Sequence, residues 1–380
     1  MKGITLPERT EDFTADPVEL FFDLAYVIAF SQLVGVLVHE PTWEGVGKVG
    51  LLFGLLWLPW QQLTWTANAI SGNGRGVRAI FLVATAVSVP MAASTATAFE
   101  DGGLPFAITL ATIMGLGFAM QSLSAERGTG FRQAVVRWIT PNVVAVIVLL
   151  VGATVDGNAR IALWLLAMLI VVGAMVLAGG GEWVIRAGHF AERHGLIVII
   201  ALGEVIVAIG LPVFAALDAE EGIPGRTIIA LAASGVFAGL TWWGYFDRPG
   251  PALEHRAEAI PATERGRYAR DVYTWAHAPI VIGIILSAAA LEEITLHPTD
   301  ALALPFRAML IGGLALLVCG IVLAIRRAFG VVPKERIVFG VVIAALLLLA
   351  ADWDGIVLLV LVDLAMFATL VIEHRRVEGG

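Results

Sequence analysis

The fold of this protein is decided by stretches such as PVELFFDLAYVIAFSQ, residues 17–32, near the start of the chain. About 20 apolar residues cross a bilayer as a helix, and this run carries two carboxylates, Glu19 and Asp23, four residues apart. A charge inside hydrocarbon costs at least about 2.5–3.5 kcal/mol on insertion scales. The stretch therefore predicts a membrane-spanning helix whose acidic residues are retained for a reason.

The composition extends this interpretation to the whole chain. Of 380 residues, 58% are hydrophobic and only 15% are charged, against about 25% charged in soluble domains. We therefore expect an all-α polytopic membrane protein that contacts the lipid bilayer. The net charge of −8 gives no reason to expect a nucleic-acid partner. Cys319 is the single cysteine and forms no intramolecular disulfide.

The apolar runs predict twelve spans. Each is close to the length that a helix needs to cross the bilayer. Their expected ranges are 17–38, 44–67, 77–98, 104–123, 134–154, 160–178, 195–216, 226–246, 272–291, 303–325, 336–352 and 354–372.

The distribution of basic residues supports this count. With the N-terminus in the cytoplasm, all but four of the 24 lysines and arginines fall on the inner side, Arg193 among them. The exceptions are Lys48, Arg160, Arg226 and Arg307. This asymmetry predicts that both termini are cytoplasmic. The longest loop, residues 247–271, is then cytoplasmic, and we expect a solvated, partly helical connector.

A faint internal repeat suggests two halves. Leu63-Thr64-Trp65 near the end of the second span matches Leu240-Thr241-Trp242 near the end of the eighth. We therefore divide the chain into an N-terminal six-helix half, residues 1–190, and a C-terminal half, residues 191–380. Six spans per half would relate the two by a pseudo-two-fold axis along the membrane normal, with a shared cavity between them.

The two acids of the first span have different explanations. Asp16-Pro17-Val18-Glu19 has the pattern of an N-cap, a proline at the first helical position and an acidic N3 residue, so Glu19 is expected to cap the helix. Asp23 lies one turn deeper, where no cap motif needs it. It either bonds a neighbouring helix for packing or lines an ion path.

Further polar residues lie inside other spans. Glu204 and Asp363 are the deepest charges, and each suits either proton coupling or a structural hydrogen bond. His277, Gln32 and Asn68 are expected to shape the same path. Trp138 and Trp183 are expected in the interfacial aromatic belt.

These residues resemble a known family. ELFFDL (19–24) with Gln32, and ERHGLIVIIALGE (192–204), are similar to the signatures of the bacterial low temperature requirement A proteins. WWGYFD (242–247) and the segment around His277 also fit that pattern. His194 stands where an aromatic such as Phe is expected, a departure that should matter little at the inner membrane edge. The resemblance implies a multi-pass protein of the bacterial cytoplasmic membrane and supplies no substrate or catalytic residue.

The function that these features favour is secondary transport driven by protons or monovalent cations. Asp23, Glu204 and Asp363 would bind the coupling cation, and a small solute would be the cargo. A passive ion channel and an intramembrane lipid-handling enzyme are the alternatives. The chain contains no recognisable catalytic, nucleotide, metal or cofactor motif, so an enzyme is the less favoured class. The sequence gives no oligomeric state.

Overall fold

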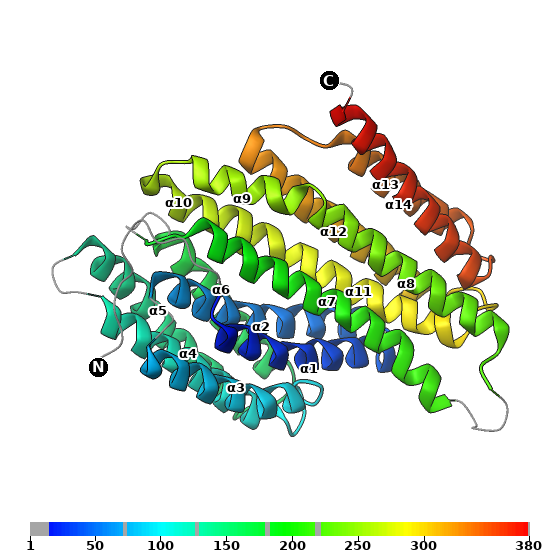
Figure 1. Ribbon diagram of the computed structural model, residues 1–380. Coiled ribbons are helices and arrows are strands. Elements are labelled where there is room, and N and C mark those ends of the chain that lie inside the picture. Colours follow the sequence, from blue (N-terminus) through cyan, green and yellow to red (C-terminus); the bar gives the residue numbers. More distant parts are fainter. Residues whose placement is uncertain (1–14, 71–73, 126–128, 179–182, 217–221, 379–380) are drawn as a thin grey trace. The chain divides into compact units, whose positions relative to one another are not determined.

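The computed structural model describes residues 15–70, 74–125, 129–178, 183–216 and 222–378, and these form helices joined by short connections (Figure 1). The twelve long helices follow the twelve predicted spans. They are α1 (Pro17–His39), α2 (Trp43–Ala69), α3 (Arg75–Thr95), α4 (Gly103–Ser124), α5 (Gly130–Gly152), α6 (Gly157–Ala178), α7 (Ala187–Ala216), α8 (Gly225–Phe246), α11 (Ala276–Leu296), α12 (Leu304–Phe329), α13 (Lys334–Leu349) and α14 (Gly355–Glu378).

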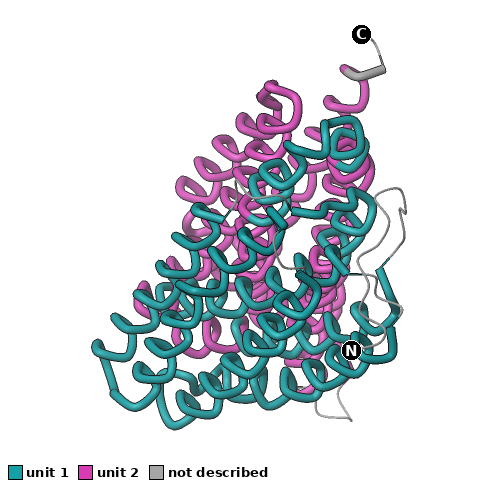
Figure 2. The backbone as a smooth tube through the Cα atoms, turned by 90° about the vertical axis from the view of Figure 1, so that its left-hand side faces the viewer, with its two compact units in different colours: residues 1–33, 47–196, 254–274 teal, residues 34–46, 197–253, 275–380 magenta. Residues whose placement is uncertain are grey.

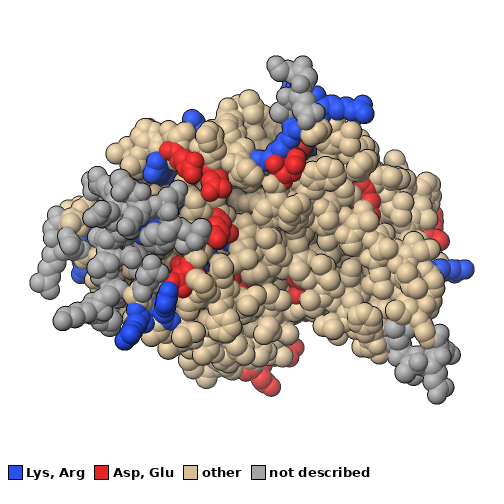
Figure 3. All heavy atoms as spheres, viewed as in Figure 1, with Lys and Arg blue, Asp and Glu red and all other residues tan. Residues whose placement is uncertain are grey.

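Ten of these helices, within the described ranges, are long and apolar enough to cross a membrane. The two that fall short are α2, whose second half carries Gln61, Gln62 and Asn68, and α13, which has 16 residues. The predicted all-helical, multi-span membrane protein is confirmed. Figure 3 agrees, because charged side chains form small groups on a mostly uncharged face.

The start of α1 is fixed by the predicted cap. The Asp16 carboxylate accepts a hydrogen bond from the Val18 backbone N–H at 3.1 Å, and Glu19 Oε1 accepts one from the Asp16 N–H at 3.3 Å. This reciprocal pair satisfies two backbone donors that the helix itself leaves free. The cap fixes the position at which α1 begins, and therefore the depth of Glu19 and Asp23.

The contacts within the described chain divide it into two compact units (Figure 2). Unit 1 comprises residues 1–33, 47–196 and 254–274, and unit 2 comprises residues 34–46, 197–253 and 275–380. Each unit is assembled from separate stretches of sequence. The predicted division into halves at residues 190 and 191, with its pseudo-two-fold axis, stays a prediction.

Unit 1 contains a run of neighbouring helices in which α3 packs on α4, α4 on α5, and α5 on α6. At two glycines, side chains from a neighbouring helix approach the backbone closely. A Cβ on Gly117 of α4 would lie 2.6 Å from the Gln62 side-chain nitrogen, and a Cβ on Gly152 of α5 would lie 2.6 Å from the Trp164 ring. The glycines therefore leave room for large side chains from neighbouring helices.

Unit 2 is organised around the pair α11 and α12, whose backbones approach at three glycines. A Cβ on Gly283 would lie 2.5 Å from the Gly313 carbonyl oxygen, and a Cβ on Gly320 would lie 2.5 Å from that of Ala276. Helix association in lipid relies on such close packing, because lipid tails are as apolar as the side chains. Around this pair, α8 packs on α11 and α14, and α13 packs on α12 and α14.

The predicted connector at residues 247–271 is more ordered than expected. It contains α9 (Pro249–Ala259) and α10 (Ala262–Tyr268), and it runs into a π-helical turn, η1 (Ala269–Trp275). The expectation of a solvated connector is wrong for Tyr268 and Ala269, which are buried in unit 1. These residues are apolar or aromatic, and burial removes that surface from water.

Candidate functional site

The first two turns of α1 and of α7 carry four charged or titratable side chains that meet in the interior of unit 1. We call Glu19, Asp23, His189 and Arg193 the ion cluster. Glu19 Oε2 accepts hydrogen bonds from His189 Nε2, at 3.0 Å, and from Arg193 Nη1. Since Glu19 Oε1 caps α1, this carboxylate both starts its own helix and binds α7. The predicted capping role is confirmed, but it is only half of what Glu19 does.

Asp23 is bound to the same guanidinium. Its Oδ1 accepts from Arg193 Nη2 at 2.7 Å and from the Trp60 indole N–H at 2.8 Å. The Arg193 guanidinium carbon lies 5.8 Å from the centre of the Trp60 ring, which adds a cation–π contact. Asp23 Oδ2, in contrast, is buried without a hydrogen-bond partner.

The spacing in the sequence explains why these four side chains meet. Glu19 and Asp23 are four residues apart on α1, and His189 and Arg193 are four residues apart on α7, so each pair lies on one helix face. All four side chains are at most 1% exposed. Two carboxylates therefore share one permanent cation, Arg193, out of contact with solvent.

A second polar chain lies beside the ion cluster and runs through His194. His194 Nδ1 donates to the Phe190 carbonyl at 2.8 Å, which leaves Nε2 to accept from the Gln61 side-chain nitrogen at 2.9 Å. Gln61 Oε1 in turn accepts from the Thr274 hydroxyl at 3.0 Å. The expectation that His194 matters little is wrong, because this buried ring connects α7 to α2 and, through Gln61, to η1.

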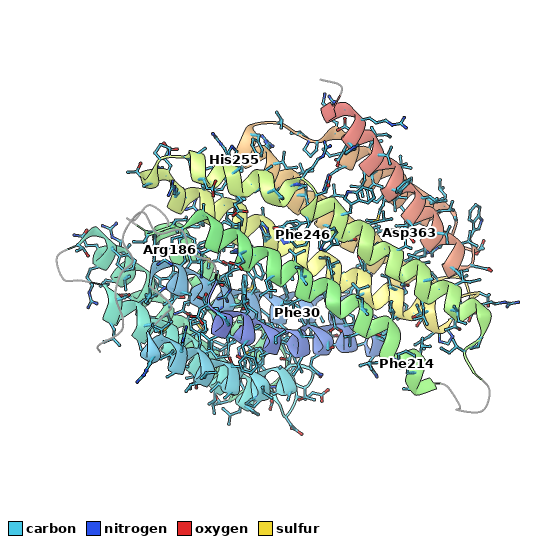
Figure 4. All side chains as sticks on the ribbon, in the orientation of Figure 1. Phe30, Arg186, Phe214, Phe246, His255 and Asp363 are labelled. Carbon is cyan, nitrogen blue, oxygen red and sulfur yellow. The ribbon has the colours of Figure 1, made fainter. Side chains whose placement is uncertain are left out.

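Asn68 and Gln32 are the other predicted site residues of unit 1. Asn68 is buried and binds backbone only: its nitrogen donates to the Val184 carbonyl at 2.7 Å and its oxygen accepts from the Arg186 N–H at 3.1 Å. These bonds fix the segment that leads into α7, near Arg186 in Figure 4. Gln32 is partly buried on α1. Their place in an ion path stays a prediction.

The remaining candidates lie in unit 2. Glu204 is buried on α7, and His277 is buried on α11 with its Nε2 hydrogen-bonded to the Tyr245 hydroxyl at 2.7 Å. Asp363 lies on α14 (Figure 4), 7% exposed, with Oδ1 lacking a hydrogen-bond partner. A role for these three in one path also stays a prediction. Within the described ranges, no three His, Cys, Asp or Glu side chains are arranged to hold a metal ion.

Sequence reasoning missed the two basic members of the ion cluster. It placed Arg193 among the inner arginines and began the seventh span at residue 195, whereas α7 begins at Ala187. The sequence did contain a signal for them, because two buried acids four residues apart in an apolar helix call for a nearby basic partner. His189 and Arg193 have the matching spacing, but 170 residues separate each of them from its acid.

The pattern of the family described as bacterial low temperature requirement A protein (LtrA) matches residues 14–371. The chain belongs to this family. A relative, the uncharacterized protein RA0937 of Rhizobium meliloti (strain 1021), is 28% identical over 352 residues, which cover 88% of this chain and 82% of the relative. No solved structure matches the chain. The matched range includes all four members of the ion cluster.

Proposed function

We propose that this LtrA protein is a proton-coupled secondary transporter of the bacterial cytoplasmic membrane, and that the ion cluster binds the coupling proton. The observation that carries the proposal is the imbalance of charge among the described residues: two buried carboxylates face one guanidinium. A net charge in a dry interior is costly. Binding one more proton would remove the net charge of the ion cluster.

The count of charges identifies two places for that proton. With His189 neutral and both acids ionised, the ion cluster carries one net negative charge. A proton on His189 or on Asp23 makes the cluster neutral. Asp23 Oδ2 is the free oxygen that would accept it, while His189 already donates to Glu19 through Nε2.

Proton binding at either place changes the bonds between α1 and α7. A proton on Asp23 removes its ion pair with Arg193, and a proton on His189 strengthens the pair with Glu19. A ligand shifts a two-state equilibrium only through different interactions in the two states. The ion cluster supplies that difference at a contact between two helices, as alternating access requires.

Two acids close in sequence to the ion cluster have partners of their own. Asp16 is bound to Arg78 at 2.9 Å, and Glu192 Oε2 accepts from the Ala15 N–H at 2.6 Å. Glu204 and Asp363 of unit 2 remain proposed cation-path acids, with Gln32, Asn68 and His277 shaping the path.

Proteoliposomes that contain a pH-sensitive dye provide the test. Amino acids, sugars, organic acids, amides and ammonium are added in turn, and we expect at least one to produce proton movement with the wild-type protein. Asp23→Asn should abolish this movement, because it leaves one acid facing one cation. Asp352→Asn, which changes an exposed acid, is the matched control.

Two results would contradict transport. Ion currents in planar bilayers that need no second gradient would identify a channel. An altered membrane lipid composition in a deletion strain at low temperature, without solute-linked proton movement in vesicles, would identify a lipid-handling enzyme.

A further inference from the structure

Unit 1 also contains a small cavity that the ion cluster does not use. Its volume is about 40 Å³, and its walls come from α2, α4, α5, α6, η1 and the segment before α7. Three indole side chains, those of Trp65, Trp138 and Trp183, line it. A cavity needs roughly 10–15 Å³ of this kind of space for each water, so about three waters, or a solute of three or four non-hydrogen atoms, would fit.

Three polar atoms on residues that line this cavity have no hydrogen-bond partner: Gln62 Oε1, Gln121 Oε1 and Trp138 Nε1. Their side chains are well buried, because the residues are 2%, 2% and 5% exposed. Leaving one such atom unpaired is costly, and proteins rarely do so. Three unpaired atoms around one cavity indicate a site shaped for an occupant that bonds them.

The orientation of Gln62 is fixed, so the free atom is an acceptor. Its side-chain nitrogen donates to the Met114 carbonyl of α4 at 3.1 Å, and Gly117 leaves the space that this contact needs. The Trp65 indole N–H is already used by the Thr274 hydroxyl at 3.0 Å. The residues that line the cavity therefore include one carbonyl acceptor, on Gln62, and one indole donor, on Trp138, without partners, and the Gln121 amide oxygen is a third such atom.

The charge of the walls favours an uncharged occupant. Arg270 is the charged residue among the described lining, and its guanidinium is bound to the Asp271 carboxylate at 2.9 and 2.7 Å. Arg270 and Thr274 both belong to the π-helical turn η1, and such turns often occur at functional sites. Among the described lining residues, an ionic ligand would find no charge that is not already paired.

We propose that this cavity binds a small uncharged amide-type solute, such as acetamide or urea. An amide offers two N–H donors for Gln62 and Gln121 and one carbonyl acceptor for the Trp138 N–H. Its planar body suits walls made of indole rings. The assignment of such an amide as the transported solute rests on the proposed transport function. The assignment of the cavity as a binding site for it does not.

The test uses the full-length protein in lipid nanodiscs and saturation-transfer NMR with acetamide as the probe. We expect magnetisation transfer to the acetamide methyl group. In the double variant Gln62→Leu, Gln121→Leu the affinity should fall at least about tenfold, because two hydrogen bonds are lost. Gln133→Leu, at an exposed position of α5, is the matched control and should bind as the wild type does.

Competing probes define the chemistry. Acetone, which lacks donors, and acetate, which is charged, should give signals several-fold weaker than acetamide. Equal signals from acetone or acetate would overturn the assignment, as would a signal that survives in the double variant. A signal no stronger than that of empty nanodiscs would show that the cavity holds water only.

Thermal unfolding distinguishes a ligand-binding role of Gln121 from a structural role. Gln121→Leu removes an unpartnered buried oxygen, so its unfolding midpoint should equal or exceed that of the wild type. A clear drop would indicate a structural role for Gln121 and count against the assignment. Acetamide binding at equilibrium needs no gradient, so the two proposals can fail separately. If the wild-type protein moves protons but does not bind acetamide, this inference alone is overturned. If it binds acetamide but moves no protons, transport alone is overturned.

Discussion

The ion cluster of unit 1 and the α11–α12 contact of unit 2 hold helices together by opposite means. In the ion cluster, long charged side chains cross from α1 to α7. At the α11–α12 contact, glycines let two backbones meet with almost no side chain between them. The glycine contact is purely packing. The ion cluster carries a desolvation cost that packing alone would avoid, which is why we assign it a function.

The largest expected effect is that of removing the single guanidinium of the ion cluster. Arg193→Leu leaves Glu19 and Asp23 buried without a cation, which should cost about 3–5 kcal/mol of unfolding free energy. Thermal or chemical unfolding of the purified protein measures the loss. Adding Glu19→Gln and Asp23→Asn to the same chain should restore most of it. A single variant as stable as the triple variant would show that the acids do not depend on Arg193.

The glycine contact should respond to volume and not to charge. Gly313→Ala places a Cβ 2.5 Å from the Ser287 hydroxyl oxygen and 2.6 Å from the Gly283 carbonyl oxygen, so we expect a loss of about 1–3 kcal/mol. Gly312 is the neighbouring residue and has open space around it, so Gly312→Ala should be neutral or stabilising by up to about 1 kcal/mol. Equal unfolding midpoints for the two variants would contradict the close approach.

The departure of His194 from an aromatic provides a smaller test in unit 1. His194→Phe removes the acceptor of the Gln61 side-chain nitrogen, at an expected cost on the order of 1 kcal/mol. Adding Gln61→Leu should recover part of the loss, because both partners are then apolar. If the double variant is less stable than the single variant, Gln61 is held by its bond from Thr274 and not by His194.

The smallest effect on stability is expected from Asp23→Asn. The change keeps an acceptor for Trp60 and Arg193 and leaves Glu19 paired one to one, so the unfolding free energy should change by no more than about 1 kcal/mol. The same variant should lose all solute-linked proton movement. A stable variant that still couples protons would assign the proton to His189, which His189→Gln then tests.

The sequence was a good guide to helices and a partial guide to the site. The twelve spans follow from hydropathy, and the Asp16–Glu19 cap follows from a local motif, because both depend on residues close together in the chain. Glu19 and Asp23 were found because charge in an apolar run stands out. Trp138 was expected at the membrane interface, yet it is buried and lines the cavity of unit 1.

The sequence by itself determined that this chain is a helical membrane protein of the LtrA family. A spanning segment must satisfy its backbone hydrogen bonds internally, so a local stretch of about 20 residues is enough to specify it. Only the tertiary structure decided that Arg193 and His189 meet the acids of α1, and that two glutamines and an indole surround one cavity. Those contacts depend on which helices pack together, and hydropathy does not encode that choice because ten of the long helices in the described chain are similarly apolar.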